Sequence, residues 1–467
     1  MLTRFKSSRN PNRNPPTVPF DLIKVGNSGR QWKCVRFVSA ALGVFCLLMA
    51  LNASRPVFSQ SITLTILDPE WSSPDVLPKA EQEAEAFTHE TGIKIEHPPL
   101  PETSLGQLEL SRKLLREGNP SPDVFGIDVI WPSLLAGYLV DLKPYFDAEL
   151  SSLDPDIVAN YTVDGKVVAI PYHIHVGVMA YRTDLLSKYG YPKPPKTWDE
   201  LEEMAVRIQA DERAKGNKDF WGYVWQGAAA EGLTCNALEW QIGEGGGRII
   251  EGDKTISVNN PAAIRAWQRA AHWIGWISPP GVVAYREPDA MNLWASGRAA
   301  FWRTWEWDYR LTHWHESAMG DKTGFTSVPG GRGQRAGALG GTGLAVSRFA
   351  AHRQEAIALI RFLVRREIQS KKDTANAKAP REPELYDLPP ALDPYAHPTP
   401  KSHRRSGVVV RPSIIVGDAY EKVTQAYFLA VHSVLAGEKS APGAAAELEK
   451  QLIAITGFKT GPPKSAN

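Results

Sequence analysis

Strands and helices alternate in the first part of this chain, and this alternation constrains the fold more than any other feature of the sequence. Residues 62–67 read ITLTIL, in which polar and apolar residues alternate as they do in a β-strand. A charged, alanine-bearing segment up to His89 predicts a helix, and 93–96 a second strand. A further helix is predicted at 105–118 and a further strand at 121–128. This order favours an α/β fold, with a parallel or mixed sheet and helices on its faces.

A second α/β pattern starts near Asp164 and is distinct from the first. Residues 164–171 and 172–182 predict paired strands. Farther along, Thr197 and Glu200 have the spacing of a capping box at the start of a helix. A chain of 467 residues is long enough for two or three domains, so the two patterns are compatible with separate units.

The N-terminal segment has the composition of a leader rather than of a folded domain. Residues 1–36 are polar and basic, and an apolar run occupies 38–51. That run is typical of a signal peptide and is short for a helix that spans a membrane. We therefore expect residues 1–59 to be a signal segment. A lipoprotein anchored at Cys46 and an uncleaved membrane anchor are the alternatives.

Without the leader, the chain is acidic and has a single cysteine. Residues 1–59 hold nine of the 53 Lys and Arg residues and one of the 51 Asp and Glu residues, which leaves 44 basic and 50 acidic residues, a net charge of −6. An acidic chain gives no reason to expect a nucleic-acid partner. Cys34 and Cys46 lie in the leader, so Cys235 has no partner for an internal disulfide, and stability must come from a large core.

Residues 301–310, FWRTWEWDYR, combine five aromatic rings with two carboxylates and two arginines. Side chains alternate along a strand, so Trp302 faces away from Trp305, and we expect Trp302 to pack in the core. Pyranose sugars have apolar faces that stack on indole rings, and they have hydroxyls that carboxylates bind. Trp305 and Glu306 are therefore candidate sugar-binding residues. Packing of both strand faces in a core is the alternative.

Further candidates lie where strands and helices begin or end. Asp128 follows a strand, at the edge where ligands bind in open α/β sheets, and Trp131 comes shortly after it. Their alternative roles are helix capping and packing on a helix face. Glu231 starts a helix, whose dipole alone would favour a carboxylate. Gly341 and Thr342 would let the backbone approach a ligand closely, or they form a plain turn.

The motifs for metals, cofactors and catalysis are weak. His173 and His175 share one face of a strand, and 313–316 read HWHE, but this spacing is not a standard zinc pattern. We predict no metal and no cofactor. We expect the histidines to hydrogen-bond a polar ligand; solvated or core histidines are the alternative. A glycoside hydrolase needs only two placed carboxylates, so an enzyme that uses Glu231, Glu306 or Asp308 stays an alternative.

Several stretches after the leader resemble the family 1 extracellular solute-binding proteins of ABC sugar importers, especially the trehalose- and maltose-binding branch. Their order and their coverage of the chain make the resemblance specific. The stretches are FTHETGIKIE (87–96), PDVFGIDVIWPSLLAGYLVDLKPY (122–145), VGVMAYRTDLLSKYGYPKPPKTWDEL (176–201), QGAAAEGLTCNALEW (226–240), GRAAFWRTW (297–305), ALGGTGLAVS (338–347) and RPSIIVGDAYEKV (411–423).

The resemblance implies a periplasmic-binding-protein-like fold of two α/β lobes, joined by hinge crossings, with the ligand cleft between them. The N-terminal lobe would consist of residues 60–170 and 322–370. The C-terminal lobe would consist of 171–321 and 371–458, followed by a disordered tail at 459–467.

The resemblance also implies a non-catalytic component of an ABC importer for a di- or oligosaccharide such as a trehalose- or maltose-like glucoside. Such a protein is periplasmic, closes on its sugar and delivers it to the permease subunits, which an ATPase drives. We expect a monomer. A binding protein that feeds a membrane receptor, as a sensor, is a further hypothesis.

Some residues match the family's sugar site and others depart from it. Asp128 matches its hydroxyl-binding aspartate, Trp305 its stacking aromatic and Arg411 a ligand-facing arginine, while Gly341 and Thr342 lie in the loop that lends backbone to the sugar. The departures are His173 and His175, where related proteins often have Tyr and Asp, and Glu306. These differences suggest a modified or amino-bearing glucoside.

Overall fold

The computed structural model describes most of the chain after the leader. It describes residues 62–72, 77–101, 103–151, 153, 155–305, 319, 322–332, 335–376 and 407–464. The predicted leader at 1–59 lies outside these ranges. No helix within them is both long and apolar enough to cross a lipid bilayer.

The first part of the chain folds in the predicted β-α-β-α-β order. Its elements are β1 (Thr63–Leu67), α2 (Leu77–Thr91), β2 (Lys94–Glu96), α3 (Ser104–Arg116) and β3 (Val124–Asp128). Strand β1 pairs in parallel with both β2 and β3. The apolar residues of β1 and β3 are buried, as the alternating pattern of ITLTIL predicts for β1.

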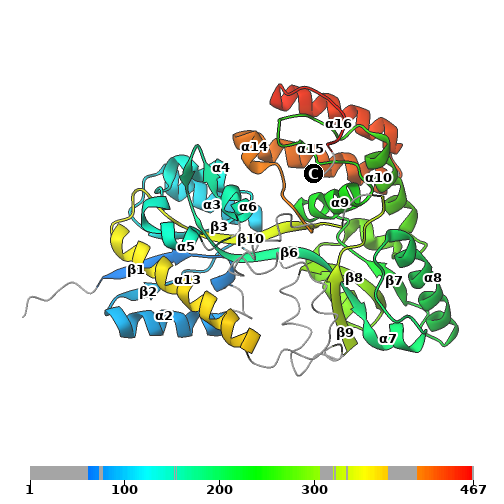
Figure 1. Ribbon diagram of the computed structural model, residues 1–467, viewed down its shortest axis with the longest axis horizontal. Coiled ribbons are helices and arrows are strands. Elements are labelled where there is room, and N and C mark those ends of the chain that lie inside the picture. The colour runs from blue at the N-terminus through cyan, green and yellow to red at the C-terminus, as the bar shows by residue number, and fades with distance from the viewer. Residues whose placement is uncertain are drawn as a thin grey trace, which may run out of the picture. The chain divides into compact units, whose positions relative to one another are not determined.

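Two long strands carry the sheet from this part of the molecule into the next (Figure 1). Strand β6 (Ile170–Arg182) pairs with β10 (Gly337–Val346) through residues 170–176 and with β8 (Ala299–Trp305) and β9 (Thr323–Ser327) through residues 177–182. The sheet order is β2-β1-β3-β10-β6-β8-β7, with β11 on β10 and β9 on β6.

One predicted strand pairing is wrong. Residues 164–171 do not pair with 172–182; instead β5 (Lys166–Val167) forms a short hairpin with β4 (Thr162–Val163). Strand β6 is continuous over 13 residues, and it pairs with β10, β8 and β9. These partners are distant in sequence, so the local pattern could not identify them.

The second part of the chain is again α/β. Its elements after β6 are α7 (Thr183–Lys188), α8 (Trp198–Ala214), β7 (Trp221–Val224), α9 (Glu231–Gly243), α10 (Pro261–Trp273), η4 (Pro280–Ala284) and α11 (Glu287–Ala295). The capping box predicted at Thr197 and Glu200 forms at the start of α8. Strand β7 is parallel to β8.

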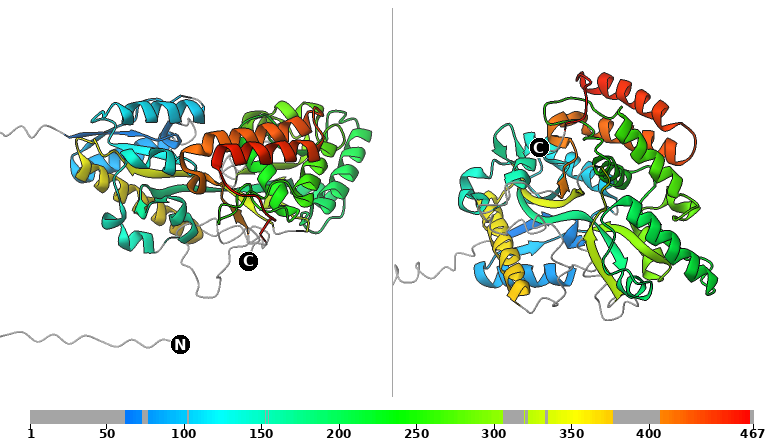
Figure 2. Two further views of the ribbon diagram at one scale, coloured as in Figure 1. Left: turned by 90° about the horizontal axis from the view of Figure 1, so that it is seen from above. Right: turned by 45° about the vertical axis from the view of Figure 1, so that its right-hand side comes forward.

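Short helices and the last part of the chain complete both lobes. The short helices are α4 (Pro132–Leu135), α5 (Asp147–Ser151) and α6 (Pro155–Asn160). The last part of the chain forms α13 (Arg353–Asn376), β11 (Val408–Val409), α14 (Ser413–Val416), α15 (Tyr420–Leu435) and α16 (Ala441–Thr456). Figure 2 shows α15 and α16 side by side in the second lobe, where they also contact α10. Helix α13 packs instead on the first lobe, against α2.

The cores follow this division. One large apolar cluster lies among α8, α9, α10, α15 and α16, and two smaller ones lie on either side of the first lobe's strands. Trp302 packs in a fourth cluster with Trp294, as expected of its strand face. The structure is therefore the two-lobed α/β fold with strand crossings, while the exact lobe boundaries stay a prediction.

The predicted disordered tail is wrong for the residues that the structure describes. The Lys459 carbonyl accepts a hydrogen bond of 2.9 Å from the Ile256 amide, and the Gly461 amide donates one of 3.0 Å to the Ile256 carbonyl. The chain here forms an isolated β-bridge with the loop that precedes α10. This pairing could not be predicted from the polar composition of the segment, because it is formed by hydrogen bonds between backbone groups.

Candidate functional site

A cavity of about 690 Å³ opens where the two lobes and the crossing strands meet. The first lobe lines it with Pro69, Thr103, Ser104, Gln107, Asp128 and Trp131; the second with Gln226, Ala228, Ala230, Glu231, Gly232, Leu233, Cys235, Tyr285, Arg286, Glu287, Pro288 and Trp305. Strands β6 and β10 and the segment after β11 contribute His175, Gly340, Gly341, Thr342 and Arg411. Its size lies within the range of small-molecule binding sites.

Asp128 lies at the end of β3, and its side chain keeps 28% exposure toward the cavity. The Ile130 amide donates a hydrogen bond of 3.1 Å to its Oδ1. Burial raises the pKa of Asp128 to about 6, although the Arg411 guanidinium 3.8 Å away and the Ile130 amide act in the opposite direction. The carboxyl group therefore both accepts and, when protonated, donates hydrogen bonds near neutral pH.

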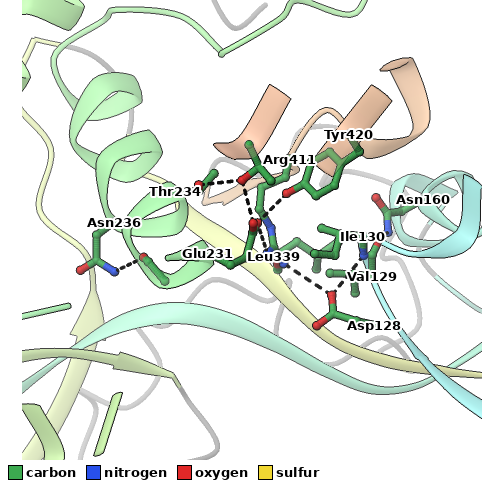
Figure 3. Close-up of polar contacts among 12 residues, drawn as sticks. Asp128, Val129, Ile130, Asn160, Glu231, Thr234, Asn236, Leu339, Arg411 and Tyr420 are labelled. Carbon is green, nitrogen blue, oxygen red and sulfur yellow. Dashed lines mark hydrogen bonds and ion pairs between the residues drawn. The ribbon is translucent and has the colours of Figure 1, made fainter. Parts of the chain in front are cut away.

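Arg411 lines the cavity and is held by a network of polar contacts (Figure 3). Its side chain is 4% exposed, and its Nη1 donates to Glu231 Oε1 at 2.8 Å. Its Nη2 donates to the Leu339 carbonyl of β10 at 2.9 Å. Although burial opposes its charge, the pKa of Arg411 is raised well above its usual value by its electrostatic interactions with Cys235, Tyr420, Glu231 and Asp128.

Glu231 accepts hydrogen bonds from two hydroxyl groups as well as from Arg411. The hydroxyl of Tyr420 donates to its Oε1 at 2.5 Å, and that of Thr424 to its Oε2 at 2.7 Å. The residue is the first of α9, and its side chain is still 30% exposed at the cavity. This arrangement fixes Arg411 in one orientation, with Glu231 as its principal partner.

Trp305 ends β8, and its indole ring is part of the cavity wall. A Cβ added to Gly340 would lie 2.8 Å from the ring, so only glycine permits this close packing. The Arg303 guanidinium lies 4.3 Å from the ring centre, and the indole Nε1 donates to Glu287 Oε1 at 2.6 Å. The ring is therefore held at three points while it stays half-buried.

Gly341 and Thr342 lie where β10 passes between β3 and β6. Gly341 has a φ of +103°, and a Cβ there would lie 2.0 Å from the His173 carbonyl oxygen. The strand is irregular directly afterwards, between Thr342 and Gly343. The Thr342 hydroxyl is buried at the cavity and has no hydrogen-bond partner among the described residues. A buried polar group in this position is suited to a polar ligand.

The structure separates some of the predicted residues. His175 lines the cavity, whereas His173, which is next along the same face of β6, does not; their rings are parallel with centres 6.4 Å apart. Trp131 lines the cavity but is only 2% exposed and belongs to the first lobe's core, so it packs as the alternative role requires, while its contact with a ligand stays a prediction. Glu306 and the HWHE stretch lie outside the described residues. Within those residues, no group of three or more His, Cys, Asp or Glu side chains could hold a metal.

Several cavity residues were not predicted. Thr103 caps α3 and lies with Ser104 and Gln107 on the first-lobe side, while Gln226 and Glu287 lie opposite. The only local signal was that Thr103 caps one helix and Glu287 begins another, and helix starts are common throughout the chain. Their approach depends on how the lobes meet, which no local pattern reports.

Comparisons with known proteins agree with this architecture. Residues 71–370 match the sequence profile described as bacterial extracellular solute-binding protein. A probable ABC transporter-binding protein of Deinococcus radiodurans is 38% identical over 88% of this chain and 99% of its own length. Among solved structures, maltose-bound MalE3 of T. maritima aligns with a TM-score of 0.72 at 29% identity, covering 84% of this chain and all of that one.

A more distant structure shares the fold. The GacH receptor of Streptomyces glaucescens, solved without ligand and with acarbose, aligns with a TM-score of 0.70 at 21% identity, covering 86% of this chain and all of that one. The profile match and the Deinococcus relative show the family directly. The chain therefore belongs to the bacterial extracellular solute-binding proteins of ABC transporters, a non-catalytic family that works in the periplasm or outside the cell.

Proposed function

We propose that this protein binds a di- or oligosaccharide, of the trehalose- or maltose-like glucoside type, and delivers it to the membrane permease of an ABC importer. The observation that carries the proposal is the composition of the cavity wall. It combines the half-buried Trp305 ring with Asp128, Arg411 and the buried Thr342 hydroxyl, contributed by both lobes and by a crossing strand. The maltose bound to the MalE3 relative supports the same ligand class.

Each group has a role that follows from its chemistry. The Trp305 ring would stack on the apolar face of a pyranose, and Asp128 and Arg411 would hydrogen-bond its hydroxyls. Thr342 would provide a hydroxyl partner. Glu231, whose oxygens already accept from three side chains, would act chiefly by orienting Arg411.

The position of the cavity supplies the transport step. A sugar that touches both lobes stabilises the closed arrangement over the open one, and a permease can distinguish the two. We propose that the protein works as a monomer in the periplasm, after residues 1–59 are removed as a signal peptide. A glycoside hydrolase, the alternative considered above, is wrong for this chain because its family is non-catalytic.

The test is a tryptophan-fluorescence titration of the leaderless chain against trehalose, maltose, sucrose and smaller glucosides. We expect a saturable spectral change with at least one sugar, and recovery of that sugar unaltered. No response to any of them would contradict binding of a plain disaccharide.

We further propose that His173, His175 and Glu306 favour a modified or amino-bearing glucoside. Of these, His175 lines the cavity, so it is the residue to change. His175→Asp should gain affinity for plain trehalose. An affinity equal to that of the unmodified protein, measured by calorimetry, would contradict this assignment.

A further inference from the structure

An ion pair between Arg303 and Glu239 lies directly behind the cavity wall. Arg303 Nε donates to Glu239 Oε2 at 2.9 Å and Nη2 to Oε1 at 2.5 Å, and both side chains are completely buried. Removing two charges from water is unfavourable, and an apolar pair of equal volume is often at least as stable. The pair is therefore poorly explained by stability alone.

We propose that the Arg303–Glu239 pair is a positioning device, which holds Trp305 and Gln226 in the cavity wall and fastens them to the strands that cross between the lobes. The proposal rests on the proposed function, because it assumes that Trp305 contacts the ligand. Neither Arg303 nor Glu239 lines the cavity, so both would act through other residues.

The link to Trp305 is direct. The Arg303 guanidinium carbon lies 4.3 Å from the centre of the indole, on which a planar guanidinium stacks well. Glu239 holds the guanidinium through two hydrogen bonds, so its orientation is fixed. The ring therefore rests on a support that water does not reach.

The link to Gln226 runs through Nη1, the remaining nitrogen of the Arg303 guanidinium. Arg303 Nη1 donates to Gln226 Oε1 at 3.4 Å, and Asn236 Nδ2 donates to the same oxygen at 2.9 Å. The two donors fix the orientation of the Gln226 side chain, which lines the cavity. One guanidinium thus orients an apolar and a polar element of the same wall.

The pair also contacts both crossing strands, through a hydrogen bond to β10 and through close packing against β6. The Ala338 amide of β10 donates to Glu239 Oε1 at 2.9 Å. On β6, a Cβ at Gly177 would lie 2.0 Å from Glu239 Oε1 and 2.4 Å from Arg303 Nη2. Strand β6 pairs with β10 up to Val176 and with β8 from Gly177 onward. The Arg303–Glu239 pair therefore lies at the point where β6 changes its partner strand.

The experiment compares Arg303→Lys with Arg213→Lys. Lysine keeps the charge at 303 but lacks the planar fork, so the Trp305 ring should lose its support. Arg213 stacks on Trp221 at 4.2 Å in the same lobe, and neither residue lines the cavity, which makes it a matched control.

Two readouts are needed, one of which requires no ligand. In protein labelled with 5-fluorotryptophan, the ¹⁹F resonance of Trp305 is assigned by its loss in Trp305→Phe. We expect Arg303→Lys to shift or broaden this resonance in the unliganded protein and to weaken binding of the sugar found by titration about tenfold, the coupling typical of contacting residues. Arg213→Lys should change neither. If Arg303→Lys fails to fold, the double variant Arg303→Met with Glu239→Met takes its place, since an apolar pair is compatible with the core.

An unchanged Trp305 resonance together with unchanged affinity in the folded Arg303 variant would overturn the proposal and reduce the pair to core packing. If the unmodified protein binds none of the sugars, the proposed function fails instead. The ¹⁹F comparison then decides by itself whether Arg303 positions the Trp305 ring.

Discussion

Helix α9 contributes the glutamates of two Arg–Glu pairs that differ in their access to water. Glu231 and Glu239 are eight residues apart on one helix, and Arg411 and Arg303 are their partners. Both pairs also hold β10, through the Leu339 carbonyl and the Ala338 amide respectively. Yet Glu231 is 30% exposed at the cavity, whereas Glu239 is fully buried.

This difference indicates different tasks for the same chemistry. The outer pair, Arg411–Glu231, borders the cavity and can exchange hydrogen bonds with a ligand. The inner pair, Arg303–Glu239, has no such freedom, because losing either member would leave a charge without a partner in the interior. We therefore expect variants of the inner pair to affect mainly folding and ring position, and variants of the outer pair to affect mainly binding.

The largest effect should follow from breaking the inner pair. Glu239→Gln leaves the Arg303 charge buried and only weakly compensated, so the free energy of unfolding should fall by about 3–5 kcal/mol. Urea denaturation measures this fall. A loss smaller than that of Glu231→Gln would contradict the distinction between the two pairs.

The next effect concerns the ring that the inner pair supports. Trp305→Ala should weaken sugar binding by about 2 kcal/mol, roughly thirtyfold, as removal of an aromatic anchor does. Calorimetric titration measures it, and Trp276→Ala, a change at an exposed tryptophan that does not line the cavity, is the control. Equal losses in both variants would argue against a special role for Trp305.

Breaking the outer pair should be milder for the fold. In Glu231→Gln the amide oxygen can still accept from Tyr420 while the amide nitrogen donates to the Thr424 hydroxyl, and water reaches the site, so we expect a stability loss of about 1–2 kcal/mol. Sugar affinity should fall as well, because Arg411 loses the negative charge of its principal partner. Unfolding and binding measured on one preparation separate the two effects; an unchanged affinity would show that Arg411 needs no such support.

Burial of Asp128, which lies beside the outer pair, sets a pH dependence. The pKa of Asp128 is about 6 in the folded protein against an ordinary value of 3.8, so the folded state holds its proton longer than the unfolded state. This contribution is complete below about pH 4 and is lost as the pH rises through about 6. Asp128→Asn should remove that decline in stability, which urea unfolding at several pH values would detect. Parallel curves for the two proteins would contradict it.

The smallest change tests the buried hydroxyl between the lobes. Thr342→Val removes a group that has no hydrogen-bond partner among the described residues, so stability should be equal or slightly higher. Affinity for the sugar should fall by about 1 kcal/mol, roughly fivefold. Thermal unfolding with and without sugar measures both quantities; unchanged affinity would exclude the hydroxyl from the site.

The sequence predicted what depends on local patterns. Alternation identified β1 and the face of Trp302, and cap spacing identified the start of α8. Asp128 and Trp305 stood out because strand ends with carboxylates or rings suit a ligand, and both line the cavity.

What the sequence could not predict depends on contacts between distant segments. The Arg303–Glu239 pair joins residues 64 apart, and nothing near either residue distinguishes it from a surface arginine or glutamate. Thr103 and Glu287 reach the cavity only because the lobes face one another. The continuity of β6 was missed for the same reason, since its partners are far along the chain.

The most direct test of the account is a crystal structure of the leaderless protein with the sugar that saturates the fluorescence titration. We predict one sugar in the cavity between the lobes, with a pyranose stacked on Trp305 and hydroxyls within hydrogen-bond distance of Asp128, Arg411 and Thr342. A sugar bound elsewhere, or a cavity left empty at a saturating concentration, would contradict the account.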